Sequence, residues 1–172
     1  LDPEGVFVIQ QNYLASMIGE QNAFDNILHE HREYFSLLAL EDLLGKHNLE
    51  VFDVEFNSIN GGSIRTYIKF KNNDNIKGFY GSEERLTNAR EKERNMGLDT
   101  ERPYLEFASR IEGIKEKLMN FLKSEKEKGK KICIYGASTR GNVALQYFGL
   151  NSELITMIAD KNSDKWGKKT IG

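Results

Sequence analysis

A strand, a glycine turn, a helix and a second strand follow one another in residues 130–160, and this order constrains the fold more than any other feature. In KKICIYGASTRGNVALQYFG an apolar run enters a glycine turn and continues into a helical pattern. In NSELITMIADKN a second apolar run ends in an acidic residue, Asp160. Short apolar runs bounded by turn residues are typical of buried strands. The sequence therefore predicts a β-α-β unit, a building block of α/β folds.

The glycine turn also carries the strongest chemical signal in the sequence. Backbone N–H groups at the start of a helix attract anions, above all phosphate. Ser138 and Thr139 add hydroxyl groups, either of which can cap the helix, and Arg140 adds a planar cation suited to phosphate oxygens. The candidate phosphate-binding residues are Gly136, Ala137, Ser138, Thr139 and Arg140.

Asp160 indicates that the ligand of this turn could be a nucleotide. It lies about 24 residues after Gly136, close to the spacing at which dinucleotide-binding units place an acid for the ribose hydroxyls. Ser138 stands where the G-x-G-x-x-G pattern has its second glycine, however, and the turn lacks the lysine of a P-loop. An ordinary helix cap is therefore the alternative to a phosphate site.

Hydrophobic periodicity predicts the remaining elements. The helical patterns are a short helix or loop at 13–20, a helix at 34–47 that stops at Asn48, and a long helix at 104–128. The strand patterns are a buried strand at 6–9 and the alternating runs LEVFDVEFN and SIRTYIKF, which flank NGG and predict an antiparallel hairpin. Residues 71–78 predict a loop, and the charges of residues 82–128 predict a solvated surface. We expect three parts, at 1–72, at 73–129 (a helical connector) and at 130–172.

The hairpin loop is a second candidate binding feature. Gly61 and Gly62 can adopt backbone angles that other residues avoid, and their small size lets a ligand approach the backbone. Ser63 and Arg65 lie on one face of the following strand. Asn60, Ser63 and Arg65 are therefore candidate substrate-binding residues. The alternative is a hairpin turn without a ligand.

His29, Glu30 and His31 form a third candidate feature, within FDNILHEHREYF. In a helix the two histidines would point in nearly opposite directions, whereas in a strand they would share a face. A zinc site usually needs about three or four ligands, and His47 and Cys133 lie elsewhere in the sequence, so we predict no metal site. A general base is better supported, because histidine titrates near neutrality and a neighbouring carboxylate can tune it. Two histidines hydrogen-bonded in a structural corner are the alternative.

Composition narrows the possible partners. The net charge of −2 over 172 residues gives no reason to expect nucleic acid or an anionic membrane surface as partner. No apolar run approaches the roughly 20 residues that span a bilayer. The single cysteine allows neither a disulfide framework nor a thiolate metal cage. We expect a cytoplasmic protein, and the first residue Leu1 and the abrupt end after KKTIG lead us to expect part of a longer chain.

Four motifs, in this order, resemble the C-terminal portion of S-adenosylmethionine-dependent sugar-nucleotide C-methyltransferases: FDNILHEHREYF, LEVFDVEFNSINGGSIR, IYGASTRGNVALQYFGL and IADKNSDKWGKKTIG. The resemblance covers nearly all of the chain. It implies that 1–72 is the end of a class I methyltransferase sheet (strand, helix, antiparallel hairpin). It implies that 130–172 is the first half of a Rossmann-like C-terminal domain. It also implies a zinc-binding N-terminal module and a glycine-rich S-adenosylmethionine loop that this chain lacks, so we expect the chain alone to be inactive.

The resemblance further implies a reaction and a role for each motif. A base removes the proton next to a keto group of a nucleotide-diphosphate sugar, and the resulting carbanion attacks the methyl group of the donor. His31 would be the base, Glu30 would be the second catalytic residue and interact with the sugar, and His29 would bind the substrate. The hairpin residues and the glycine turn would line the substrate cleft, with the turn at the diphosphate. The alternative is a dinucleotide-binding module of the NAD type without methyltransferase activity.

Overall fold

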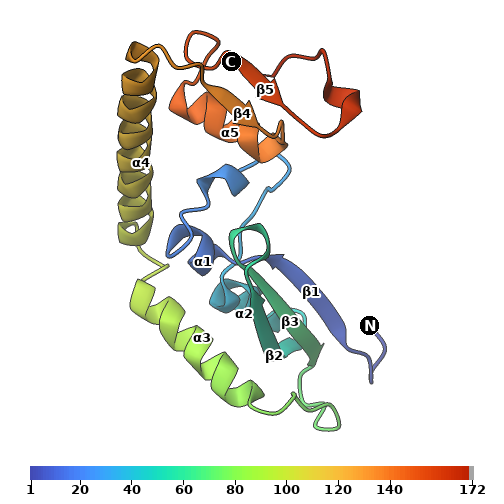
Figure 1. The fold of residues 1–172 in the computed structure, drawn as a ribbon. Coiled ribbons are helices and arrows are strands. Elements are labelled where there is room, and N and C mark those ends of the chain that lie inside the picture. The colour runs from blue at the N-terminus through green and yellow to red at the C-terminus, as the bar shows by residue number, and fades with distance from the viewer. Residues whose placement is uncertain (171–172) are drawn as a thin grey trace. The chain divides into compact units, whose positions relative to one another are not determined.

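The structure is a computed structural model that describes residues 1–170, and it divides into two compact units (Figure 1). The first unit contains residues 1–23 and 33–107, and the second contains 24–32 and the chain from 108 onward. The short segment 24–32 therefore leaves its sequence neighbours and belongs to the second unit. The units are therefore not consecutive in sequence, and the predicted domain boundaries at 72 and 129 stay predictions.

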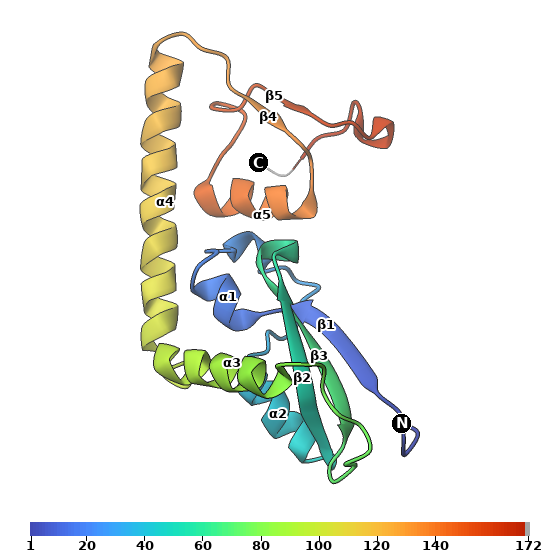
Figure 2. The same cartoon turned by 60° about the horizontal axis from the view of Figure 1, so that its bottom comes forward.

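The first unit is built on an antiparallel sheet of three strands (Figure 2). The strands are β1 (Phe7–Asn12), β2 (Leu49–Asn57) and β3 (Ser63–Phe70), in the order β1-β3-β2. The connection between β2 and β3 contains the short 3-10 helix η2 (Ile59–Gly61). The predicted strand, helix and antiparallel hairpin are thus confirmed as an α/β arrangement.

Two helices pack against β2, which gives the first unit its hydrophobic core. They are α2 (Leu37–Gly45) and α3 (Ser82–Met96), and the shorter α1 (Leu14–Ile18) follows β1. The core residues are Tyr13, Ala15, Leu37, Leu40, Leu44, Val51, Val54, Ile64, Ile68, Leu86 and Ala89. Burial of these apolar side chains supplies the main driving force for folding of this unit.

The N-terminus of α2 is satisfied by two polar side chains. Ser36 caps the helix, with its Oγ accepting a hydrogen bond from the backbone N–H of Ala39. The carboxylate of Glu93 accepts from the N–H groups of Leu37 at 2.5 Å and Leu38 at 2.8 Å, and this side chain is only 1 % exposed. The helix therefore begins later than the predicted residue 34. The sequence predicted that the charged residues of 82–128 face solvent, but Glu93 is buried.

A β-bulge at Phe52 breaks the predicted alternation of β2. Val51 lies opposite Ile68 and Asp53 lies opposite Tyr67, so Phe52 is an extra residue in the ladder. Asp53, which follows the bulge, is fully buried although it is charged. Its carboxylate accepts two hydrogen bonds from Arg85 Nη2, at 2.6 and 2.8 Å, which ties α3 to β2.

The second unit contains the predicted β-α-β arrangement. It consists of β4 (Cys133–Tyr135), α5 (Thr139–Phe148) and β5 (Met157–Ala159), with β4 and β5 paired in parallel. The long helix α4 (Arg102–Glu127) precedes it, and its position confirms the helix predicted at 104–128. The partial Rossmann-like arrangement predicted for this part of the chain is thus confirmed.

Three strands are more exposed than their apolar sequences predict. Phe7 and Val8 of β1 are almost half exposed, since the helices α2 and α3 pack against β2 at the other edge of the sheet. Tyr135 at the end of β4 is 72 % exposed, and Met157 of β5 is 59 % exposed. These strands form where the apolar runs predict them, but the prediction that they are buried was wrong: adjacent residues of β1 and alternate residues of β4 and β5 are exposed.

In residues 1–170 no helix combines the length and the apolar composition needed to cross a lipid bilayer.

Replacement of Glu93 by leucine is expected to destabilise the first unit by about 2–4 kcal/mol, because two buried N–H groups lose their acceptor. Urea unfolding followed by circular dichroism measures this change in the free energy of unfolding. Glu91→Leu is the matched control, because Glu91 lies on the exposed face of the same helix. Equal stability of the two variants would show that Glu93 is not needed to start α2.

Candidate functional site

The glycine turn connects β4 to α5 with the geometry of a capped helix N-terminus. Gly136 has a φ of 103°, a conformation that favours glycine. Ser138 has an extended backbone, and its Oγ accepts a hydrogen bond from the N–H of Gly141 at 3.0 Å. Of the two predicted capping residues, the structure uses Ser138, while Thr139 is the first residue of the helix.

Asp160 directly follows β5, and its carboxylate stabilises this turn by hydrogen bonds. Its Oδ2 accepts from the N–H of Ala137 at 2.7 Å and from Lys165 Nζ at 3.1 Å, and its Oδ1 accepts from the N–H of Asn162 at 2.8 Å. These bonds, chiefly those from the Asn162 and Ala137 N–H groups and then from Lys165, lower the pKa of Asp160 to about 2. Both carboxylate oxygens therefore accept hydrogen bonds within the turn, and the role of Asp160 as an acceptor for ribose hydroxyls stays a prediction.

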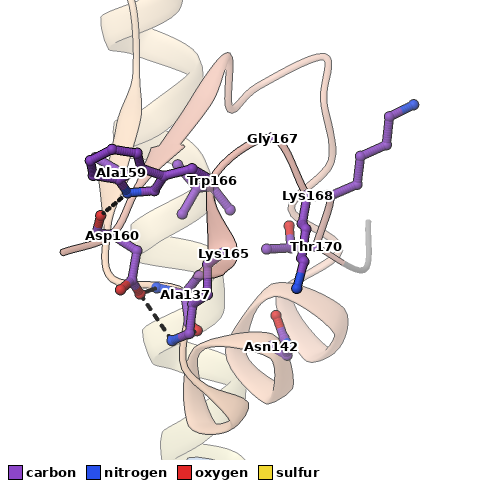
Figure 3. A pocket seen from close by; sticks show the side chains of 11 residues that line it. Ala137, Asn142, Ala159, Asp160, Lys165, Trp166, Gly167, Lys168 and Thr170 are labelled. Atoms are coloured by element: carbon purple, nitrogen blue, oxygen red, sulfur yellow. Dashed lines mark hydrogen bonds and ion pairs between the residues drawn. The ribbon is translucent and has the colours of Figure 1, made fainter. Parts of the chain in front are cut away.

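A cavity of about 650 Å³ opens beside the turn (Figure 3). Residues that follow the ends of both parallel strands contribute to its wall, among them Ala137 and Asp160. The side chain of Trp166 lies at this wall, and its indole N–H donates to the carbonyl of Asp160 at 2.8 Å. Lys165 donates to the carbonyl of Ala137 at 2.6 Å, so the loop after β5 is bonded to the glycine turn.

The segment before the histidines is attached to α5. The short 3-10 helix η1 (Phe24–Asn26) places the ring of Phe24 5.0 Å from that of Phe148 and 5.5 Å from that of Tyr147, measured between centroids. Asp25 Oδ2 lies 2.7 Å from Arg140 Nη2 and 2.8 Å from Arg140 Nε. The segment with the predicted catalytic residues and the predicted phosphate turn therefore belong to one compact unit, joined by an ion pair.

His29, Glu30 and His31 occupy a turn, neither a helix nor a strand. The N–H of His31 donates to the carbonyl of Leu28 at 3.0 Å, so His29 and Glu30 stand at the exposed corner of this turn. The Nδ1 atom of His31 lies 3.0 Å from the carbonyl oxygen of Asn26. Because a carbonyl oxygen can only accept, Nδ1 carries the proton, and the lone pair of the neutral ring is on Nε2.

The hairpin candidates belong to the first unit. Asn60 adopts a left-handed conformation with a φ of 55°, and the hydroxyl of the buried Ser63 donates to the carbonyl of Ile59 at 2.9 Å. Arg65 pairs with Glu55 at 2.9 Å. A side chain at Gly62 would meet Ser16 at 2.6 Å, so packing of the loop against α1 is sufficient to explain this glycine.

In the described part of the chain, residues 1–170, no group of three or more His, Cys, Asp or Glu side chains could hold a metal ion. Sequence analysis missed Asp25, Asn142 and Trp166, which the structure places at the turn or at its cavity. Asp25 lies within the quoted histidine motif, but its partner is more than a hundred residues away, so no local pattern indicates the pair.

Asp25→Asn is expected to loosen the segment 24–32 and to leave His31 as a mixture of tautomers, because the charge that holds this segment to Arg140 is lost. Two-dimensional ¹H–¹⁵N spectra of the imidazole ring measure the tautomer. The double variant Asp25→Arg, Arg140→Asp should restore the wild-type spectrum, and Asp42→Asn, which breaks an exposed ion pair with Lys46, is the control. An unchanged His31 spectrum in Asp25→Asn would contradict the positioning role of the pair.

The lowered pKa of Asp160 predicts a pH dependence. A carboxyl group with a depressed folded pKa stabilises the fold above its unfolded pKa of 3.8, and this stability is lost as the pH falls toward about 2. Trp166, the only tryptophan in the sequence, should therefore change its fluorescence between pH 4 and pH 2 as the turn opens, since its indole N–H is bonded to Asp160. In Asp160→Asn this transition should be absent, and its persistence would assign it to another group.

Comparisons with known proteins agree with this architecture. Residues 58–172 match the family model described as "C-methyltransferase C-terminal domain". The chain is also 33% identical over 168 residues to "C-methyltransferase NovU" of Streptomyces niveus, and the matched region covers 98% of this chain. It covers 39% of the relative, so the chain spans well under half of that protein. On these two findings the chain belongs to the C-methyltransferase family, with the family's C-terminal domain in residues 58–172.

Proposed function

We propose that this chain supplies the catalytic base and the nucleotide-binding turn of an S-adenosylmethionine-dependent enzyme that methylates a carbon of a nucleotide-diphosphate keto-sugar. The observation that carries the proposal is the ion pair of Asp25 with Arg140, which joins the histidine segment to the glycine turn. A nucleotide sugar has its diphosphate and its reacting ring close together. An enzyme for it therefore needs its base near its phosphate site, which this unit supports.

His31 is the base in this proposal. With the proton on Nδ1 held by the Asn26 carbonyl, Nε2 accepts the proton from the ring carbon next to the keto group. The carbon–hydrogen electron pair passes into the keto group, and an enolate results. Glu30 and His29, at the exposed corner of the same turn, contact the sugar hydroxyls. S-adenosylmethionine supplies the methyl group when bound.

The diphosphate lies at the start of α5 in this proposal. Backbone N–H groups of the first helical turn donate to phosphate oxygens, together with the exposed hydroxyl groups of Ser138 and Thr139. Arg140 adds positive charge, although its Nε and Nη2 atoms are bonded to Asp25. Its first role is thus to position the histidine segment, and its contribution to phosphate binding is electrostatic.

The methyl donor and the zinc ion implied by the family resemblance require residues other than these. The strand, glycine turn and helix of residues 133–148 are assigned here to the nucleotide sugar. We therefore place the S-adenosylmethionine site, the zinc module and the rest of the methyltransferase sheet in other parts of a longer cytoplasmic protein. Asn60, Ser63 and Arg65 are proposed to contact the substrate in that whole enzyme.

A dinucleotide-binding module of the NAD type is the competing function. It would use Asp160 for the ribose hydroxyls, yet both oxygens of this carboxylate are bonded to Ala137, Asn162 and Lys165. Calorimetric titration of the chain distinguishes the two functions. Uridine or thymidine diphosphate should bind more tightly than NAD, and tighter binding of NAD would favour the competing function.

His31→Ala in the whole enzyme is expected to lower kcat by roughly 10²–10⁴-fold, because general base catalysis is lost. The KM for the nucleotide sugar should change little, since His31 does not contact the diphosphate in this proposal. Methyl transfer in steady state measures both constants, and His47→Ala, an exposed histidine after α2, is the control. Turnover within a few-fold of wild type in His31→Ala would remove His31 from the mechanism.

A further inference from the structure

We propose that the cavity beside the glycine turn binds the nucleoside part of the nucleotide, with Trp166 as a stacking surface for the base and Asn142 as a hydrogen-bond acceptor. This inference rests on the proposed function. It extends the binding site to residues that none of the sequence motifs indicates and leaves the diphosphate at the start of α5.

The cavity has the size and the position of a ligand site. Its volume of about 650 Å³ falls within the roughly 300–1,000 Å³ that small-molecule pockets occupy. It opens beside the residues that directly follow β4 and β5 in the parallel pair. In open α/β sheets ligands bind in this place, outside the carboxyl ends of the strands.

Trp166 is a large aromatic side chain that is held in place but not buried. It is 69 % exposed, and its indole N–H donates to the carbonyl of Asp160 at 2.8 Å. The hydrogen bond fixes the ring at the cavity wall, so little conformational freedom is lost when a ligand packs against it. A fixed and exposed aromatic face of this kind suits the stacking of a nucleobase.

Asn142 shows that the cavity is suited to a hydrogen-bond donor. Its side chain projects from α5 at the cavity wall (Figure 3). The Oδ1 atom is buried, and none of the residues 1–170 donates a hydrogen bond to it. A buried acceptor without a donor is unfavourable. A ribose hydroxyl or a base N–H group would satisfy it once the Asn142 side chain rotates toward the cavity, whereas a fully ionised phosphate, which only accepts hydrogen bonds, would not.

The charges around the cavity favour an anionic ligand. Lys165, Lys168 and Lys169 line it, and Asp160 is the acidic residue among the lining residues. The Asp160 carboxylate is already compensated by Lys165 and by two backbone N–H groups. Lys168 and Lys169 therefore leave the cavity positive. A ligand with an aromatic base, hydroxyl groups and phosphate groups combines all three requirements, which is the chemistry of a nucleotide.

Titration of this chain with uridine 5′-diphosphate tests the inference, because Trp166 is the only tryptophan and reports its own environment. Its fluorescence should change saturably with nucleotide. By calorimetry, Trp166→Leu should weaken nucleotide binding about 10-fold or more, as expected for the loss of base stacking, while Trp166→Phe should retain most of the affinity. Asn142→Leu should weaken binding about 5-fold or more, since the ligand loses its acceptor.

Two controls separate the nucleoside from the diphosphate. Tyr135→Leu removes another exposed aromatic ring of the same unit, which does not line the cavity, and should leave nucleotide affinity unchanged. Inorganic pyrophosphate lacks a base, so its affinity should be the same for wild type and Trp166→Leu.

The outcomes distinguish this inference from the proposed function. If uridine diphosphate binds equally to wild type, Trp166→Leu and Asn142→Leu, the nucleoside pocket is refuted while the phosphate turn stands. If neither uridine diphosphate nor pyrophosphate binds to the wild-type chain, both the pocket and the proposed function are overturned.

Discussion

The ion pair of Asp25 with Arg140 is the contact on which the arrangement of the candidate site depends. Without it, residues 24–32 would be a loop between two elements of the first unit. With it, and with the packing of Phe24 on Phe148, this loop becomes part of the second unit. Ion pairs at a half-exposed surface contribute about 1 kcal/mol or less to stability. The aromatic contact therefore contributes the apolar burial, and the ion pair determines the orientation of the segment. Orientation is what a catalytic histidine requires.

Carboxylates bonded to backbone N–H groups recur at the junctions of this chain. Glu93 accepts from the first N–H groups of α2, and Asp160 accepts from Ala137 and Asn162 around the glycine turn. Asp53, fully buried, accepts from the N–H of Phe79 and from Arg85. Each of these acids satisfies backbone donors that helix starts and loops leave without partners. Burial of a charge is tolerated at these places because several donors converge on it.

The use of Asp160 within the turn changes how the nucleotide site is understood. The acid that local spacing assigns to a ribose also bonds to the turn, to Lys165 and to the loop that carries Trp166. The turn and the aromatic side chain are therefore positioned before any ligand arrives. Such preorganisation lowers the conformational entropy lost on binding, which increases affinity without additional contacts.

The sequence by itself determined the elements and their order, because the apolar periods of strands and helices are local properties of the chain. It predicted the hairpin, the long helix, the β-α-β unit and the Ser138 or Thr139 cap, and its motifs indicated the family. The bulge at Phe52, the buried Glu93 and the partners of Asp25 and Asp160 were decided only by the tertiary structure. These features depend on groups that meet across many residues of sequence, as Asp25 and Arg140 do. A charged residue looks the same in sequence whether it is solvated or bonded to a distant partner, and only folding brings that partner to it.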